Sequence, residues 1–350
     1  MIVSTMKKIL VIGSGMTGAT TAWLLKAVNP HKISISLWDK SRGSGGRMAT
    51  SRSADDPQST VDLGAQYISI TPEYQQKHSS IHSQLIEGDI LQPLTITPEG
   101  SRSHAEGTCH YVTPGGVSTL VKYFLKKSEC PVEFNQHVNN ISKVDDGLRV
   151  TTQQGKMEQF DSVVITMPAP QLLQLKGDVE TFVEKNTEVA NNLKAVTYSS
   201  RYALGLFYPP GTELNLPFIC KYFYEDPCIR FVSIDNKKRN SVSPDVGPSL
   251  CIHTSVPFGL KHLEEDKENV QPIIMQHVRS LLPQLPEPSS VKCQKWRFSQ
   301  VFKEYKDAPG CVVLNESPLV VAGGDSFSHS NMDGCIASAK AIVDVINSKL

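Results

Sequence analysis

Three glycines with the spacing G-x-G-x-x-G follow a short apolar run near the amino terminus, at Gly13, Gly15 and Gly18. In this pattern the first glycine permits a tight turn, the second lets the backbone approach a pyrophosphate, and the third lets a helix pack against a strand. The spacing alone is a weak signal, because a plain strand-to-helix turn also produces it. Asp39 ends the next strand pattern about 20 positions later, where a carboxylate accepts hydrogen bonds from ribose hydroxyls. Together these features predict a dinucleotide-binding unit.

Composition limits the class of protein and its partners. A chain of 350 residues exceeds most single cores, which predicts two domains. Its 35 basic and 35 acidic side chains cancel, so nothing indicates nucleic acid or an anionic membrane as the main partner. The eight cysteines form neither C-x-x-C pairs nor a zinc-finger spacing, so we expect no metal site and mostly free, buried thiols. Free thiols favour a reducing compartment.

The stretch MKKILVIGSG near the amino terminus, residues 6–15, superficially resembles a signal peptide, with two lysines before an apolar stretch. The apolar run Ile9–Ile12 is short, however, and removing it would delete the first strand. No window approaches the roughly 18 apolar residues of a membrane span. We therefore expect mature protein with no cleavable signal peptide and no transmembrane segment. This favours the cytoplasm and leaves export by an unconventional route open.

The pattern of apolar runs and glycines differs between two parts of the chain. Buried strands are predicted in KKILVIG, KISISLWDK, FDSVVITMPAP and PLVVAGG, and together they form one sheet. Helices are predicted after Gly18, within VTPGGVSTLVKYFLKK, and at the carboxyl terminus. Residues 171–309 are instead rich in strand patterns and aromatic side chains. This change in sequence pattern predicts a second domain.

Two further glycine elements strengthen the dinucleotide hypothesis. The stretch GSGGRM, which contains Gly46 and Arg47, suits a second approach to a pyrophosphate or a flavin, although glycine and serine also make plain surface loops. The stretch VVAGGDSF places Gly324 and Asp325 after a buried strand and before a helix. The amino end of that helix is suited to the negative pyrimidine edge of a flavin. Glycine elements near both chain ends predict one extended ligand on a discontinuous domain.

Longer strings carry a more specific resemblance. These are GMTG, WDK, SGGRM, DLGAQYI, SSRYALGLFY, PCIRFVSIDNKKRN, CQKWR, and GGD followed by DGC. With them the chain resembles the FAD-dependent proteins of the amine-oxidase type, and within these the renalase family, over nearly its whole length. The resemblance implies an α/β fold with a discontinuous, glutathione-reductase-like (Rossmann-type) FAD-binding domain and a β-rich α+β substrate domain. We expect the first at residues 1–74, 108–170 and 318–350, and the second at 75–107 and 171–317.

The same resemblance implies an activity and its cofactor. The family implies noncovalent FAD and an oxidase that converts the 2- and 6-dihydro isomers of NAD(P)H to NAD(P)+. Electrons then pass to dioxygen and give hydrogen peroxide. We expect a monomer whose partners are these isomers and dioxygen, with no nucleic acid and no membrane. Cys335 raises the question of a covalent flavin, but DGCIASAK lacks the glycine-pair-cysteine context of covalent amine oxidases, so burial of the thiol is favoured.

The site residues are carried over from the matching strings. Tyr222, His253 and Trp296 are implied as the walls of the nicotinamide pocket, with Tyr224 as the alternative to Tyr222. Cofactor contacts are implied for these residues: Gly13, Gly15, Thr17, Gly18, Asp39, Gly46, Arg47, Gln66, Tyr67, Gly324 and Asp325. Without the resemblance, the aromatic residues and the histidine would be interpreted as core residues.

Two other functions are compatible with this scaffold. An amine oxidase would need a base for the substrate ammonium, and His253 is the candidate. A non-enzymatic extracellular ligand would keep FAD only as a structural support. The charged turn DNKKRN is either a solvated surface turn or a binding site for the substrate pyrophosphate.

Overall fold

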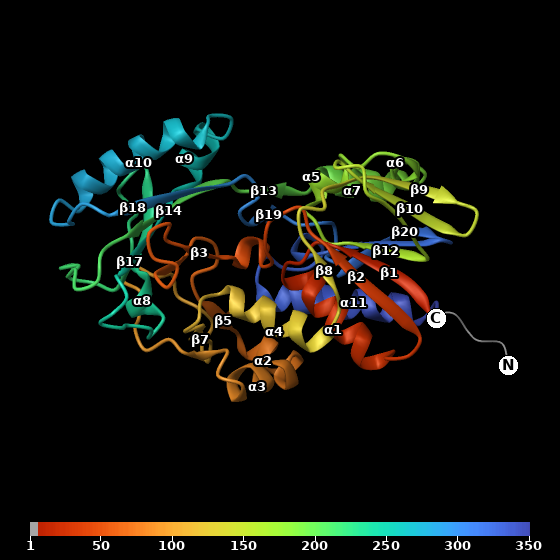
Figure 1. Cartoon of the computed structure of the whole chain (residues 1–350), viewed down its shortest axis with the longest axis horizontal. Helices are drawn as coiled ribbons and strands as arrows, with labels where there is room; N and C mark the ends of the chain where they lie inside the picture. The colour runs from red at the N-terminus through yellow and green to blue at the C-terminus, as the bar shows by residue number, and fades with distance from the viewer. Residues whose placement is uncertain (1–5) are drawn as a thin grey trace. The chain divides into compact units, whose positions relative to one another are not determined.

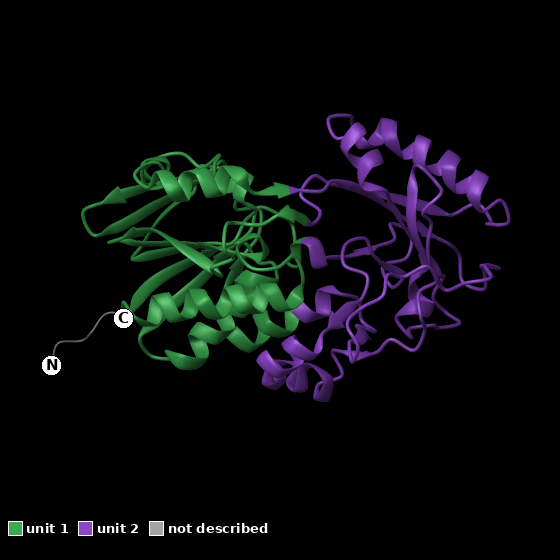
Figure 2. Ribbon diagram, turned by 180° about the vertical axis from the view of Figure 1, so that it is seen from behind, with its two compact units in different colours: residues 1–46, 121–197, 301–350 green, residues 47–120, 198–300 purple. Residues whose placement is uncertain are grey.

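The computed structural model describes residues 6–350, which form two compact units (Figure 2). Unit 1 ends its first segment at Gly46 and resumes in Val121–Thr197 and Val301–Leu350; unit 2 comprises Arg47–Leu120 and Tyr198–Gln300. Each unit is therefore discontinuous in sequence. The domain borders expected from the sequence lie elsewhere and stay a prediction.

Unit 1 is built on a six-stranded sheet in the order β20-β21-β12-β1-β2-β8. Five neighbouring strands are parallel, and β20 runs antiparallel at one edge. The strands are β1 (Lys7–Ile12), β2 (Ile33–Trp38), β8 (Val132–Glu133), β12 (Ser162–Ile165), β20 (Cys311–Glu316) and β21 (Leu319–Gly323). The apolar runs predicted from the sequence thus form one sheet, because continuous Val/Ile/Leu segments suit strands buried on both faces.

Helices cover one face of this sheet and a smaller sheet covers the other (Figure 1). On the first face α1 (Met16–Val28) packs beside α11 (Met332–Asn347), and their apolar residues share one core with β1 and β2. On the other face lie β9 (Val138–Val144), β10 (Gly147–Thr152) and β11 (Met157–Phe160), an antiparallel meander. Unit 1 also contains α5 (Ala169–Leu172), α6 (Asp178–Glu184), α7 (Thr187–Ala195), β19 (Val301–Lys303) and the 3-10 turn η2 (Asp325–Phe327).

Unit 2 is built on a five-stranded antiparallel sheet in the order β15-β16-β17-β14-β18. The strands are β14 (Arg201–Phe207), β15 (Cys220–Tyr222), β16 (Ile229–Ile234), β17 (Ser249–Thr254) and β18 (Ser290–Trp296). One face packs against α10 (Lys267–Leu281), and the other against Val61 and Leu63. Because both faces of β14 are buried, its sequence after Arg201, YALGLF, has no alternation of apolar and charged residues.

Shorter elements complete unit 2. Beside the large sheet lie the pair β3 (Thr50–Arg52) and β4 (Thr60–Asp62), and the small sheet β5 (Ile68–Ile70), β7 (Cys109–Val112) and β6 (Gln92–Pro93). The helices are α2 (Pro72–Lys77), α3 (Ser79–Glu87), α8 (Asp235–Lys238) and α9 (Val256–Lys261). Three elements include the border residues of the units: η1 (Gly46–Met48), α4 (Ser118–Ser128) and β13 (Thr197–Tyr198).

Two expectations about the whole chain are tested directly. All eight cysteines are free, as expected, but only four are buried, and Cys109 is exposed. Among residues 6–350, no helix has both the length and the apolar character needed to cross a membrane.

Candidate dinucleotide and substrate site

The glycine motif of unit 1 lies where four parallel strands end. Gly13 follows β1, Asp39 follows β2, Thr166 follows β12, and Gly324 follows β21. In open α/β sheets, ligands bind at the carboxyl ends of the strands. The sequence motifs from both ends of the chain are therefore brought to one edge of one sheet.

Glycine occurs at each of the three positions of the motif for a different local reason. Gly13 has φ +107°, a left-handed conformation that favours glycine, and a Cβ on Gly18 would collide with the Gly13 carbonyl oxygen. A Cβ on Gly15 would instead meet nothing within 4 Å. The open space beside Gly15 fits a ligand that approaches the backbone closely, as a pyrophosphate does.

The first turn of α1 leaves donors available beside that space. Gly15 is the N-cap residue and no side chain caps the helix, so the first N–H groups receive no side-chain acceptor. Thr17 is buried within this first turn. The helix terminus therefore presents N–H donors and a partial positive charge, which suits phosphate oxygens.

Asp39 is held at the end of β2 by three donors. Its Oδ2 accepts hydrogen bonds from the Ser14 backbone N–H and hydroxyl, both at 2.8 Å, and Oδ1 accepts from the Ser41 N–H at 2.8 Å. Ser14 was not singled out from the sequence, because any small residue is compatible with the motif. A carboxylate has about four acceptor positions, so Asp39 can also accept a ribose hydroxyl.

Two further glycine segments belong to the same unit. Gly45 N–H donates to the Ser14 carbonyl oxygen at 3.1 Å, and Gly46 has φ +54°. At the other end of the chain, Gly324 has φ +138°, and the nearly buried Asp325 accepts from the Ser330 hydroxyl at 3.0 Å. The helix expected after this turn is α11, which begins at Met332 and is separated from β21 by η2.

In unit 2, Tyr67 and Tyr222 form a hydroxyl pair. Their oxygens lie 2.9 Å apart, and burial raises the pKa of both phenols. Tyr224 is about half exposed, and its hydroxyl donates to the Gly100 carbonyl oxygen at 2.9 Å. Of the two tyrosines left open by the sequence, Tyr222 is thus the one joined to another candidate site residue.

His253 and Trp296 share one acceptor. His253 Nε2 lies 3.0 Å from the Leu63 carbonyl oxygen, and Trp296 Nε1 donates to the same oxygen at 2.7 Å. The two residues lie on β17 and β18, on either side of β14. A single main-chain carbonyl from residues 47–120 therefore fixes two side chains that are far from it in sequence.

The histidine is strongly disfavoured as a cation. Burial, followed by the positive charges of Arg201 and Lys238, lowers the pKa of His253 to about 3. The ring is therefore neutral over the whole range in which an enzyme of this kind works.

A buried group of charges lies behind these residues. Arg239 donates through Nε to Asp235 at 2.8 Å and through Nη1 and Nη2 to carbonyl oxygens of Pro114 and Thr60. Lys238 Nζ lies 2.7 Å from Asp235 Oδ1, with both side chains fully buried. The DNKKRN stretch is therefore not a solvated turn: Asp235, Lys238 and Arg239 are core residues, and only Lys237 of its charged residues is exposed.

This charge group was missed by sequence reasoning. An apolar strand, β16, runs directly into DNKKRN, and α8 is only four residues long. These features are also typical of a surface turn. The partners Asp62 and Gln66 lie about half the chain away, so no local pattern links them to the helix.

Arg47 belongs to unit 2 and is fixed by that unit. Its Nη1 donates to the Ser299 carbonyl oxygen at 3.4 Å, and the guanidinium lies over the Tyr198 ring at 6.0 Å. Its own carbonyl oxygen accepts from the Ala65 N–H at 3.1 Å. Gly64 is required here, because a Cβ at that position would collide with the Arg47 carbonyl.

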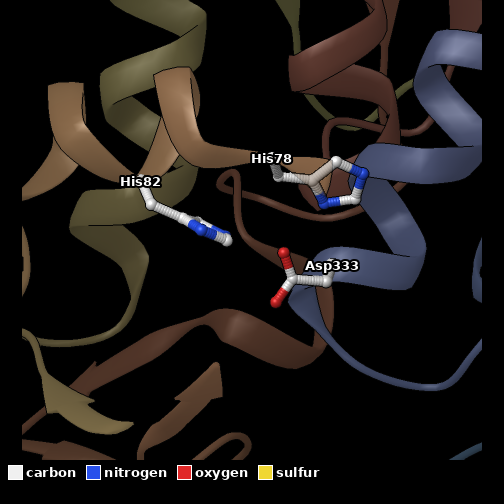
Figure 3. Close-up of side chains that lie close together, drawn as sticks. All are labelled: His78, His82 and Asp333. Atoms are coloured by element: carbon white, nitrogen blue, oxygen red, sulfur yellow. The ribbon is translucent and has the colours of Figure 1, made fainter. Parts of the chain in front are cut away.

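Two buried histidines lie outside the predicted site. His78, which precedes α3, and His82 within it have ring centroids 6.1 Å apart (Figure 3). The third residue drawn there, Asp333, is in the first turn of α11 in unit 1. His78 and His82 offer two imidazole ligand atoms, whereas structural zinc takes four protein ligands and catalytic zinc three.

The predicted site residues thus fall into two groups. Unit 1 contains Gly13, Gly15, Thr17, Gly18, Asp39, Gly46, Gly324 and Asp325; unit 2 contains Arg47, Gln66, Tyr67, Tyr222, His253 and Trp296. The first group offers main-chain donors, space and carboxylates, which suit a dinucleotide. The second offers aromatic faces and a neutral histidine, which suit a flat, uncharged ring.

Comparison with known families gives two overlapping matches, and each match includes residues of both units. Residues 11–85 match the NAD(P)-binding Rossmann-like domain, and residues 70–347 match the flavin-containing amine oxidoreductases. Mouse (Mus musculus) renalase is 44% identical to this chain over 341 residues, covering 97% of this chain and 99% of the relative.

A solved structure supports the fold. A protein of Exiguobacterium sp. 255-15, whose crystal structure carries the description protoporphyrinogen oxidase, superposes with a TM-score of 0.71. The superposition covers 99% of this chain and 100% of the other, at 15% sequence identity. At that identity the likeness concerns the fold alone.

Proposed function

The chain belongs to the family of flavin-containing amine oxidoreductases and is a renalase-like flavin oxidoreductase; from this premise we propose the reaction that it catalyses. We propose that it oxidises the 2- and 6-dihydro isomers of NAD(P)H to NAD(P)+. In this reaction one dihydronicotinamide, one proton and one dioxygen give one oxidised nicotinamide and one hydrogen peroxide. The isomer loses a hydride, and dioxygen gains two electrons and two protons.

The residues of unit 1 fit the adenosine diphosphate half of a noncovalent FAD. The uncapped turn of α1 would bind the pyrophosphate in the open space beside Gly15. Asp39 would accept the ribose hydroxyls, and Asp325 would face the ribityl chain. From unit 2, Arg47, Gln66 and Tyr67 would contact the flavin. When bound, the flavin accepts a hydride at N5 and passes the electrons to dioxygen.

The side chains of unit 2 suit a dihydronicotinamide ring. Tyr222 and Trp296 offer aromatic faces, and the Trp296 ring is fixed by its donation to Leu63. Loss of hydride from a dihydropyridine restores aromaticity, so the protein needs mainly to align the ring and exclude competing reactions. We propose these two residues and His253 as the groups that face the substrate.

The observation that carries the proposal is geometric: one carbonyl oxygen, that of Leu63, fixes the rings of both His253 and Trp296, and the pKa of His253 agrees with a neutral ring there. A base that works near neutral pH needs a pKa near the operating pH, whereas that of His253 is lowered to about 3 by burial, Arg201 and Lys238. This disfavours the amine-oxidase alternative, in which His253 deprotonates a substrate ammonium. It suits hydride loss from a neutral ring, because that step generates a positive charge and no proton.

Anaerobic mixing tests the proposed reaction. The purified yellow protein is mixed with 6-dihydro-NAD, with ordinary 4-dihydro-NADH or with a catecholamine, and the flavin absorbance is followed. We expect rapid bleaching by the 6-dihydro isomer alone, and peroxide in stoichiometric amount after air is admitted. Bleaching by the amine alone would overturn the proposal, and a protein that stays yellow with all three would favour a non-enzymatic role.

A further inference from the structure

The Gln66 amide lies between the His253 ring and a buried lysine. Gln66 Oε1 accepts from Lys238 Nζ at 2.8 Å and from the Ser233 hydroxyl at 3.3 Å. Lys238 in turn pairs with Asp235 at 2.7 Å and is 1% exposed. An ammonium group can only donate, so Lys238 requires the amide oxygen, and not the amide nitrogen, on its side.

This orientation fixes where the two amide protons point. Gln66 Nε2 donates to the Asp62 carbonyl oxygen at 2.5 Å and to that of Gly64 at 3.1 Å. Both of its protons are then used. The His253 Nε2 atom lies 3.3 Å from the same amide nitrogen, so the ring faces the donor end of the amide.

The histidine tautomer follows from these contacts. The Leu63 carbonyl oxygen, 3.0 Å from His253 Nε2, can only accept. Nε2 therefore carries the proton and donates it to Leu63. A neutral imidazole has one N–H, so Nδ1 is left with a bare lone pair.

We propose that Lys238 is a positioning residue that acts through Gln66 to keep the second proton off His253, so that the ring stays in its Nε2–H form with Nδ1 as an acceptor. Lys238 does this by holding the positive, donor end of the Gln66 amide against the Nε2 edge of the ring. An added proton on Nδ1 would place an imidazolium against that donor end.

Without the ammonium group the amide would be held less firmly. Gln66 Oε1 would keep only the Ser233 hydroxyl as a donor, while the Asp62 and Gly64 carbonyl oxygens would still hold Nε2. The donor end of the amide would then be fixed less firmly at the Nε2 edge of His253, and a second proton on the ring would be opposed less. The other charges that bear on the ring are Arg201, which opposes a second proton, and Asp235, which favours one.

The consequence for catalysis rests on the proposed function. Hydride loss gives the nicotinamide ring a positive charge, and an imidazolium beside it would oppose that step. A bare Nδ1 instead offers an acceptor to a substrate N–H or O–H. The proton position itself does not depend on which substrate is oxidised.

NMR of the holoenzyme tests the tautomer directly. Protein labelled with 15N-histidine and saturated with FAD is observed through long-range 1H–15N correlations, and His253 is assigned by the signals lost in His253→Asn. We expect an unprotonated Nδ1 and a protonated Nε2 from about pH 5 to about pH 9. A protonated Nδ1 near pH 7 would overturn the proposal, whether or not the enzyme oxidises dihydronicotinamides.

Variants then separate the positioning role from simple loss of structure. In Lys238→Met we expect the pH of half-protonation of Nδ1 to rise by about 1 to 3 units, and Lys238→Arg to restore part of the shift. Lys237→Met is the matched control, because Lys237 is exposed on the same helix; it should leave the signals unchanged. If the pH of half-protonation rises in Lys237→Met as well as in Lys238→Met, the proposal is wrong.

A second variant covers the case in which Lys238→Met does not fold. Gln66→Met keeps the side-chain volume and the Lys238 charge but removes the amide. If Lys238 acts through Gln66, Nδ1 of this variant also protonates at higher pH. If the Lys238 charge acts on His253 directly, Gln66→Met leaves the titration unchanged, and the proposed route through the amide is wrong.

Discussion

At the scale of single residues, main-chain carbonyl groups orient the candidate site. The Leu63 carbonyl oxygen accepts hydrogen bonds from the N–H groups of both His253 and Trp296. The Asp62 and Gly64 carbonyl oxygens accept hydrogen bonds from the Gln66 amide nitrogen. The string DLGAQYI therefore contributes through its backbone as much as through its side chains. From the sequence, the resemblance pointed to Gln66 and His253, but a side-chain pattern contains no information on such backbone acceptors.

Asp62 provides a prediction for stability at this scale. Burial, and then the negative charge of Asp235, raise the pKa of Asp62 from 3.8 to about 6. The folded chain thus binds this proton more tightly than the unfolded chain. The contribution of this protonation to the free energy of unfolding is fully present below about pH 4 and is lost as pH rises through about 6.

Replacing Asp62 with asparagine removes this titration. We expect the free energy of unfolding of wild type, minus that of Asp62→Asn, to fall between about pH 4 and about pH 7. Urea denaturation at fixed FAD concentration measures it. A difference that is constant or rises over that interval would contradict the raised pKa.

At the scale of elements, the β1–α1 turn was largely predictable. Apolar strands, a glycine turn and a helix are local features, and the close approach of Gly18 to the Gly13 carbonyl oxygen explains why a glycine is required there. The position of Asp39 follows from the length of the same strand–helix–strand segment. By contrast, α8 was interpreted as a charged turn, because its burial depends on β4, which lies far away in sequence.

Gly15 gives a test of the cofactor cradle. A Cβ on Gly15 meets no atom of the chain within 4 Å, and its φ of −82° suits any residue. We expect Gly15→Ala to fold with an unchanged far-ultraviolet spectrum but to lose most of its flavin, because the methyl group occupies the space assigned to the pyrophosphate. Flavin absorbance per polypeptide after gel filtration measures the loss.

The matched control is Gly43→Ala. A Cβ on Gly43 would also meet no atom of the chain within 4 Å, and this residue is exposed in the neighbouring glycine-rich segment. The variant should retain the flavin of wild type. If Gly15→Ala retains its full flavin content, the assignment of the pyrophosphate to this position is wrong.

At the scale of the whole molecule, each unit is assembled from separated stretches of chain. In unit 2, Val61 and Leu63 pack against β14 and β17, and Arg239 bonds to the Thr60 carbonyl oxygen at 3.0 Å. The second segment of unit 2 therefore lacks one face of its core when taken alone. A buried ion group without its partners is strongly destabilising.

This organisation predicts how fragments behave. We expect residues 198–300 alone to show no cooperative thermal transition, because β14 would expose the face that Val61 and Leu63 cover. Co-expression with residues 47–120 should restore part of the secondary structure measured by circular dichroism. A sharp unfolding transition of the lone fragment would show that the first segment is dispensable for this core.

The sequence by itself determined the parallel sheet, the glycine turns and the acidic residues at the strand ends, because short-range sterics and apolar periodicity govern these features. It also determined the family, through strings spread over the chain. Only the tertiary structure decided that the buried residues Asp62, Asp235 and Lys238 form one group with the partly buried Gln66 behind His253. Asp62 and Asp235 are 173 residues apart, and a contact over that separation is set by the packing of α8 against β4, which no local pattern encodes.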